Sequence, residues 1–123
     1  MTLTGAIHHL DTVKPNAFSQ DEKVRWLSML DGIIKTDLID THEGGDAVSF
    51  RPYDETTPLL QELLIPHPFD AVYIHWMEMQ IDYANGEYGK FNNSVRLYEA
   101  AFEAYEKYYH RHHKPLATAY RNF

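Results

Sequence analysis

A long apolar stripe with helical spacing runs through residues 69–113, and it strongly limits the folds open to this chain. Its members recur at alternating steps of three and four residues: Ile74, Met77, Ile81, Ala84, Tyr88, Phe91, Val95, Tyr98, Phe102, Tyr105 and Tyr109. This spacing puts all of them on one side of a helix. Many members are aromatic, and stiff rings bury a large area per side chain. The stripe therefore predicts the buried core of an all-α domain, with Tyr98 and Phe102 inside it.

The middle of this span leaves open whether it forms one helix or two. Asn85-Gly86 and Gly89 are typical of a helix end, and the Asn-Asn-Ser segment at 92–94 suits the cap of a new helix. The stripe nevertheless passes through the glycines without losing its phase. The sequence therefore predicts either a helical hairpin or one bent long helix near 68–113.

A separate helix is predicted near 19–41. Ser19 and Glu22 have the spacing of a capping box, in which each side chain binds the backbone N–H of the other residue, and Phe18 is placed to pack beside them. The apolar residues that follow cover a wide face: Val24, Trp26, Leu27, Leu30, Ile33, Ile34 and Leu38. A face of this width predicts a helix that packs between two neighbours.

The chain before and after this helix is less regular. Residues 1–17 are expected to form a short helix or an arm that is flexible or docked on a partner. Residues 44–67 are expected to form a long structured loop, in which Thr57 before Pro58 suits the cap of a short helical turn. Such loops are usually functional or disordered, and four leucines argue against disorder. We expect these leucines to contact the core or a partner: Leu59, Leu60, Leu63 and Leu64.

Length and composition indicate one soluble domain over residues 1–123. The chain has no cysteine, which excludes disulfides and thiolate metal sites. No apolar run reaches the roughly 20 residues of a membrane span, and the N-terminus lacks the pattern of a secretory signal. We therefore expect a protein made in the cytoplasm, with no membrane partner.

The charge is unevenly distributed along the chain, whose net charge is −7. Residues 1–87 carry 15 acidic and 5 basic side chains, a net charge of −10, and residues 88–123 carry 3 acidic and 6 basic ones, a net charge of +3. This difference predicts two unlike surfaces that meet different partners or another copy of the chain. The overall acidity disfavours specific nucleic-acid binding.

Eight histidines raise the question of a metal site. His75 with Glu78, and Glu106 with His110, have helical spacings that allow two side chains to share an ion, and Glu99 and Glu103 extend the second pair. Such spacings arise by chance in many helices, and the paired Glu-x-x-His helices of di-iron proteins are missing. We therefore expect no metal and no cofactor. The alternative is a small helical metal- or ligand-binding protein that uses these His/Glu pairs.

Sequence motifs for catalysis are also missing. The chain contains no Gly-x-Ser-x-Gly, no glycine-rich phosphate loop and no His-Glu-x-x-His. We therefore do not expect an enzyme.

The C-terminal residues 114–123 are predicted to form a flexible or partner-docked tail, with a frayed end as the alternative. Tyrosine and arginine are enriched at protein interfaces, and this end of the chain combines them with other cations and rings. The expected docking residues are Tyr108, Arg111, Lys114, Tyr120, Arg121 and Phe123.

Several segments resemble a family of small structural proteins of tailed bacteriophages and prophages. They are Thr57-Pro58, Leu63-Leu64-Ile65-Pro66, Gln80-Ile81-Asp82-Tyr83-Ala84-Asn85-Gly86-Glu87-Tyr88, Phe91-Asn92-Asn93-Ser94 and Tyr108-Tyr109-His110-Arg111. In size and helical content the family resembles the head–tail connector (adaptor) proteins, which form a ring under the portal. The resemblance covers residues 13–115. It implies a virion protein made in the host cytoplasm, whose partners are further copies of itself and portal, tail or neck proteins.

Overall fold

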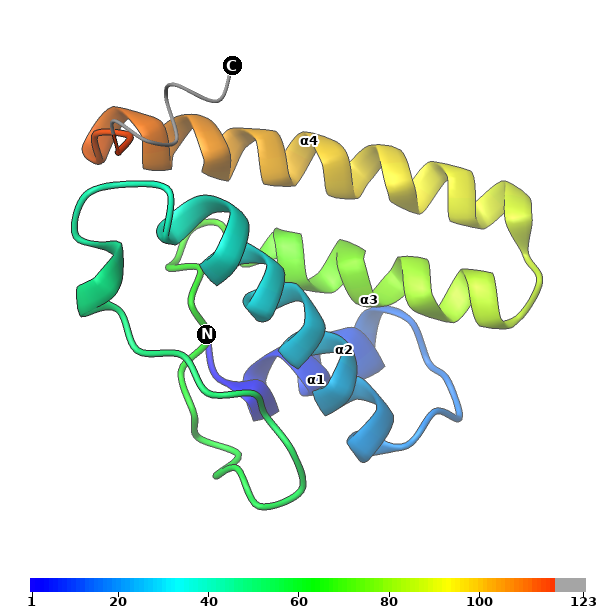
Figure 1. The fold of residues 1–123 in the computed structure, drawn as a ribbon. Helices are drawn as coiled ribbons and strands as arrows, with labels where there is room; N and C mark the ends of the chain where they lie inside the picture. Colours follow the sequence, from blue (N-terminus) through cyan, green and yellow to red (C-terminus); the bar gives the residue numbers. More distant parts are fainter. Residues whose placement is uncertain (117–123) are drawn as a thin grey trace.

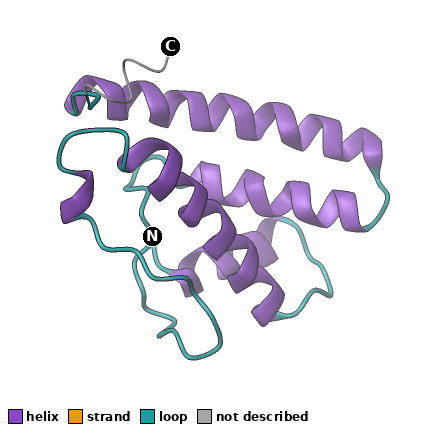
Figure 2. Cartoon of the chain, viewed as in Figure 1, coloured by secondary structure: helices purple, strands orange, loops and turns teal. Residues whose placement is uncertain are grey.

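Four α-helices form the bundle that the computed structural model describes for residues 1–116 (Figures 1 and 2). They are α1 (Leu3–Val13), α2 (Gln20–Ile34), α3 (Ala71–Ala84) and α4 (Tyr88–His112). Figure 1 shows α4 lying along one side of α3, while α1 and α2 pack against its other side. The described part of the chain contains no strand, so the predicted all-α fold is confirmed.

The helix predicted near 19–41 is present as α2 followed by one wider, π-helical turn at Lys35–Ile39. The Ser19 Oγ accepts a hydrogen bond from the Glu22 N–H over 3.1 Å, which caps the first turn. The return bond of the capping box is replaced, because the Glu22 carboxylate pairs with Arg25. The Phe18 ring lies 5.3 Å from that of Trp26 and covers the start of the helix.

The long span forms a hairpin of two helices. Gly86 adopts the left-handed backbone conformation that glycine tolerates best (φ = +70°), and the Glu87 N–H then donates to the Asp82 carbonyl over 2.9 Å. Because α4 already begins at Tyr88, the expected cap at 92–94 is wrong. Those residues lie inside the helix, where the Ser94 hydroxyl donates a hydrogen bond to the Asp82 carboxylate.

The apolar stripe belongs to the core only in part. Ile74, Met77 and Ile81 on α3 and Tyr105 and Tyr109 on α4 are buried. Tyr98 and Phe102 are only half-buried, contrary to expectation, and Tyr88 is largely exposed. The reason is that α4 packs chiefly on α3 alone, so Tyr88, Tyr98 and Phe102 have no third helix to cover them.

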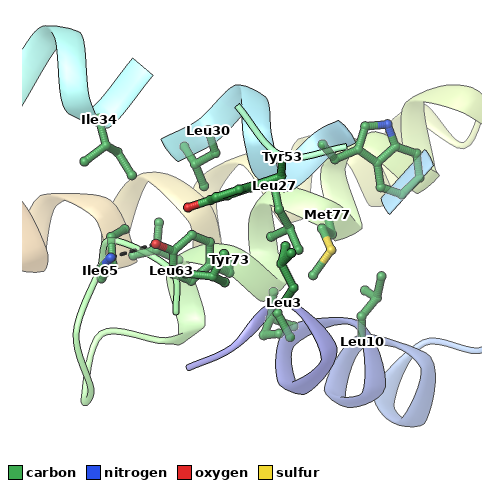
Figure 3. Packing of buried hydrophobic residues seen from close by; sticks show 14 of the residues in the cluster. Leu3, Leu10, Leu27, Leu30, Ile34, Tyr53, Leu63, Ile65, Tyr73 and Met77 are labelled. Carbon is green, nitrogen blue, oxygen red and sulfur yellow. Dashed lines mark hydrogen bonds between the residues drawn. The ribbon is translucent and has the colours of Figure 1, made fainter. Parts of the chain in front are cut away.

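Residues 1–17 do not form an arm; the short-helix alternative is the correct one. Helix α1 is capped by Thr2, whose Oγ1 accepts from the Gly5 N–H over 3.0 Å. It buries one side in the core, and these residues have regular helical spacing: Leu3, Ala6, Ile7 and Leu10. Figure 3 shows Leu3 and Leu10 pointing toward Leu27 and Met77. An arm that docks elsewhere would remove this part of the core.

The long loop is structured, as predicted, but it contains no helical turn after Thr57. The Thr57 Oγ1 instead accepts a hydrogen bond from the Asp54 N–H over 3.0 Å. Beyond Pro58 the chain runs beside the N-terminal residues, where the Leu3 N–H donates to the Gln61 carbonyl over 3.0 Å. This pairing satisfies backbone groups that a helical turn would use internally.

A buried carboxylate, that of Asp31 on α2, ties the loop to the helices. It accepts hydrogen bonds from the Tyr53 hydroxyl at 2.6 Å, the Tyr73 hydroxyl at 2.7 Å and the Leu64 N–H at 3.0 Å. The Tyr73 hydroxyl in turn accepts from the Ile65 N–H over 2.7 Å (Figure 3). These four bonds join α2 and α3 to two parts of the loop, its middle at Tyr53 and its end at residues 64–65.

The Asp31 carboxyl gives the fold a pH dependence. Burial raises its pKa, because the loss of solvation outweighs the hydrogen bonds it accepts. The folded chain therefore holds this proton more tightly than the unfolded chain. The resulting stabilisation is complete below the ordinary pKa of about 3.9 and declines as pH rises through the raised pKa.

We therefore expect the free energy of unfolding of the parent, relative to Asp31→Asn, to fall as pH rises through this window and then to level off. Urea denaturation of both proteins at matched pH values from about 4 to 8 measures the difference. A parent that gains stability relative to the variant with rising pH would contradict the raised pKa.

Candidate functional site

Three aromatic side chains lie together where α3 turns into α4, and we call them the hairpin tip: Tyr83, Tyr88 and Phe91. Tyr83 is 66% exposed and Tyr88 63% exposed, while Phe91 is half-buried. The Tyr83 ring centroid lies 5.7 Å from that of Phe91 and 6.5 Å from that of Tyr88. Large exposed rings that touch one another, rather than the core, are typical of protein interaction sites.

The local sequence explains why these rings face outward. Successive helical residues are rotated by about 100°, so Asp82 points into the bundle while Tyr83 points out of it. After the turn at Gly86, Tyr88 and Phe91 stand three residues apart and therefore share one side of α4. The turn brings that side next to Tyr83.

A buried polar network lies beneath the hairpin tip. The Asp82 carboxylate, which is fully buried, accepts a hydrogen bond from the Ser94 Oγ over 2.8 Å and forms an ion pair with Lys14. These contacts tie α3 to α4 and to the segment after α1. Because these contacts hold the backbone of the hairpin tip in place, the tip loses little conformational entropy when it binds a partner.

Charged residues border the tip. The Lys90 Nζ lies 2.9 Å from the Glu87 Oε2, and the hydrogen bond to Glu87 raises the pKa of Lys90. Lys90 is therefore charged near neutral pH. The tip thus combines apolar rings with a polar rim, the usual arrangement of an interface.

Of the expected docking residues at the C-terminal end, the structure describes Tyr108, Arg111 and Lys114. The Tyr108 ring lies 5.0 Å from Phe69 and 4.4 Å from His112, so it packs on its own fold. Arg111 and Lys114 are exposed. Tyr120, Arg121 and Phe123 lie outside the described residues.

The tail was expected to begin at Lys114, but residues 114–116 are part of the fold. The Glu43 N–H donates to the Lys114 carbonyl over 2.7 Å, and the Leu116 N–H donates to the Thr41 carbonyl over 2.9 Å. This antiparallel contact pairs backbone groups after the end of α4 with those after the π-helical turn. No local sequence pattern predicts this contact, since the two segments are far apart in the chain.

The four loop leucines separate into two pairs. Leu63 is buried and Leu64 half-buried, so this pair belongs to the core and its edge. Leu59 is 40% exposed and Leu60 76% exposed. Beside them lies a cavity of about 800 Å³, whose lining includes Phe50, Tyr53, Pro58, Arg51 and Gln61. We call Leu59, Leu60 and this cavity the loop face.

The His/Glu pairs do not assemble a metal centre. The His75 Nδ1 lies 2.8 Å from the Glu78 Oε1, so these two groups satisfy each other. The His110 Nδ1 faces the His42 Nε2 at 2.8 Å, not a glutamate. Within residues 1–116, no three His, Asp or Glu side chains are placed to hold one ion.

Sequence reasoning did not identify the hairpin tip. Its rings belong to the same stripe as the core residues, and only the position of the turn decides which of them are covered. The glycines around residue 86 were the available signal, since the hairpin alternative leaves the nearest rings without a third helix.

No match to this chain was found among protein-family models, curated proteins or solved structures. Among the described helices, none combines the length and apolar character that crossing a membrane requires. The geometry of the chain's own residues therefore carries the functional argument.

Proposed function

We propose that this chain is a structural protein of the bacteriophage head–tail interface, where it assembles as a homo-oligomeric ring between portal and tail or neck components. The observation that carries the proposal is the exposed, rigidly supported hairpin tip. The segments that resemble the phage family, 80–88 and 91–94, contain the tip rings together with Asp82 and Ser94 beneath them. The resemblance thus falls on residues that suit a role in assembly.

A ring of identical subunits needs two unlike surfaces on each copy, because each copy contacts its two neighbours differently. The hairpin tip offers one such surface, and the loop face offers a second. Figure 1 shows the turn between α3 and α4 well separated from the loop that follows α2. We assign the contact between neighbouring copies to these two surfaces.

The charge distribution supports contacts between copies. The acidic residues lie mainly before residue 88, and most of the basic residues of the last third belong to α4. Attraction between such surfaces weakens with salt, because the Debye length falls from about 10 Å at 0.1 M to about 3 Å at 1 M. The ring is therefore expected to be less stable at high ionic strength.

Replacing both tip tyrosines by serine is expected to abolish assembly. Buried aromatic anchors at interfaces contribute about 2 kcal/mol each or more, so losing Tyr83 and Tyr88 should weaken association about a thousandfold. Leu60→Asp should break the opposite surface. Sedimentation velocity at high protein concentration measures the result. Val13→Ser, at an exposed apolar residue on α1, is the matched control and should assemble like the parent.

Mixing the two defective variants provides a sharper test. Each variant keeps one intact surface, so the mixture should form pairs of one tip variant and one loop variant and stop there. A tip variant that assembles like the parent, or a parent that stays monomeric at every concentration, would contradict the proposed ring. A mixture that rebuilds full rings would show that the two surfaces do not meet.

A further inference from the structure

Two histidines from distant parts of the sequence meet near the end of α4. His42 follows the π-helical turn and is buried, whereas His110 belongs to the last turn of α4 and is exposed. The His42 Nε2 and the His110 Nδ1 lie 2.8 Å apart, and the ring centroids 4.8 Å apart. Neither histidine belongs to the hairpin tip or to the loop face.

The protonation of His42 follows from its other contacts. Its Nδ1 lies 2.6 Å from the Leu38 carbonyl oxygen and 3.0 Å from the Thr41 Oγ1. A carbonyl oxygen only accepts hydrogen bonds, so the His42 Nδ1 must carry the proton. In the neutral ring the Nε2 then holds a lone pair aimed at His110. The Tyr109 ring, packed edge-on at 5.1 Å, helps to hold this orientation.

This is the arrangement found in metal-binding histidines, which donate their other ring N–H to a carbonyl or carboxylate. In the metal-free pair, the His110 Nδ1 proton bridges the two rings. A metal ion can replace that proton when the exposed His110 ring tilts, so that both lone pairs bind an ion lying beside the line between the two nitrogens. The proton leaves to solvent, as is usual when a metal displaces it from a ligand.

The spacing of the two nitrogens favours a particular geometry. With metal–nitrogen bonds of about 2.0–2.1 Å, ligands at a right angle stand about 2.9 Å apart, and tetrahedral ligands about 3.3 Å apart. The observed 2.8 Å is close to the right-angled arrangement. Square-planar and octahedral sites have such angles, and with imidazole ligands they are typical of Cu²⁺ and Ni²⁺.

We propose that His42 and His110 form a two-histidine site for a divalent transition metal ion, Cu²⁺ or Ni²⁺, with solvent at the remaining positions. The exposure of His110 leaves those positions open to water. A bound ion would join the end of the α2 region to the end of α4. The ion would lie beside the contact of residues 41–43 with 114–116. Because only the folded chain brings the two histidines together, the bound ion would stabilise the folded chain.

Nickel titration of the untagged, chelator-treated protein tests the site. The parent should bind Ni²⁺ in calorimetry, and its thermal midpoint should rise with Ni²⁺ concentration. His110→Ala should weaken the affinity at least about tenfold, since it removes one of two ligands. His112→Ala is the matched control, because that exposed histidine packs on the Tyr108 ring and hydrogen-bonds the Tyr108 carbonyl rather than facing His42, and it should bind like the parent.

A parent whose midpoint does not change up to millimolar Ni²⁺ would overturn the proposal, as would a His110→Ala variant with the parent's affinity. His42 is buried, so its replacement is expected to affect folding as well as metal binding. Its role is therefore measured in the parent protein. Paramagnetic Ni²⁺ should broaden the imidazole NMR signals of His42 and His110 before those of other histidines. Earlier broadening at His8, His9 or His75 would assign the metal elsewhere.

Discussion

Asp31→Ala is expected to remove a large part of the stability of the fold. The substitution leaves two tyrosine hydroxyls and the Leu64 N–H without their buried acceptor, and it opens a cavity in the core. Each unsatisfied buried donor costs about 1–3 kcal/mol, so the total loss should be about 4 kcal/mol or more. Domains of this size have about 5–15 kcal/mol in all. Urea denaturation followed by circular dichroism at neutral pH measures the change.

Two further variants distinguish the loss of the hydrogen bonds to Asp31 from the effect of replacing any carboxylate. Tyr53→Phe removes a single hydrogen bond to Asp31 and should cost about 1–2 kcal/mol. Asp37→Ala removes an exposed carboxylate from the π-helical turn and should change stability by less than about 0.5 kcal/mol. If Asp31→Ala were as mild as Asp37→Ala, the carboxylate would not hold the loop.

Gly45→Ala is expected to have an effect of similar size for a steric reason. A Cβ at this position would lie 2.1 Å from the Ile39 carbonyl oxygen and 2.8 Å from its carbonyl carbon. Both atoms belong to the backbone, so no side-chain rotation relieves the clash. We expect a loss of about 3 kcal/mol, which lowers the thermal midpoint by roughly 10 °C or more.

Gly89→Ala is the matched control for this clash. Nothing lies within 4 Å of a Cβ built there, and the residue is helical. Alanine should stabilise α4 by up to about 1 kcal/mol, since glycine is a poor helix former. The same substitution should thus have opposite signs at the two positions. Differential scanning calorimetry decides this, and a neutral Gly45→Ala would show that the turn after His42 shifts to accommodate a methyl group.

The helices could be predicted because their signals are local. Ser19 marks the start of α2, and the spacing of Ile74, Met77 and Ile81 identifies the buried side of α3. The same spacing at Leu3, Ala6, Ile7 and Leu10 is a weaker signal, since two histidines and a small alanine make that stripe inconspicuous. Helix α1 was therefore predictable in principle, but only as an alternative to an arm.

The contacts that shape the site could not be predicted in this way. The Asp31 carboxylate binds Tyr53 and Tyr73, and His42 faces His110, across large separations in sequence with no periodic pattern. The burial of individual side chains along α4 could not be predicted either, because it depends on which helix lies opposite each turn. The relationship to phage connector proteins rests on the sequence resemblance and stays a prediction that the assembly experiments address.

The contact between residues 41–43 and 114–116 affects how the chain folds during synthesis. The first segment leaves the ribosome long before the second, and at about 5–20 residues per second the delay lasts several seconds. Isolated helices as short as α1 and α2 are marginal in water, so these two segments are not stable while their packing partners are still missing. The nascent chain therefore exposes the apolar residues of its first two helices until α3, which packs against both, is released. Chaperones that bind nascent chains have those seconds in which to act.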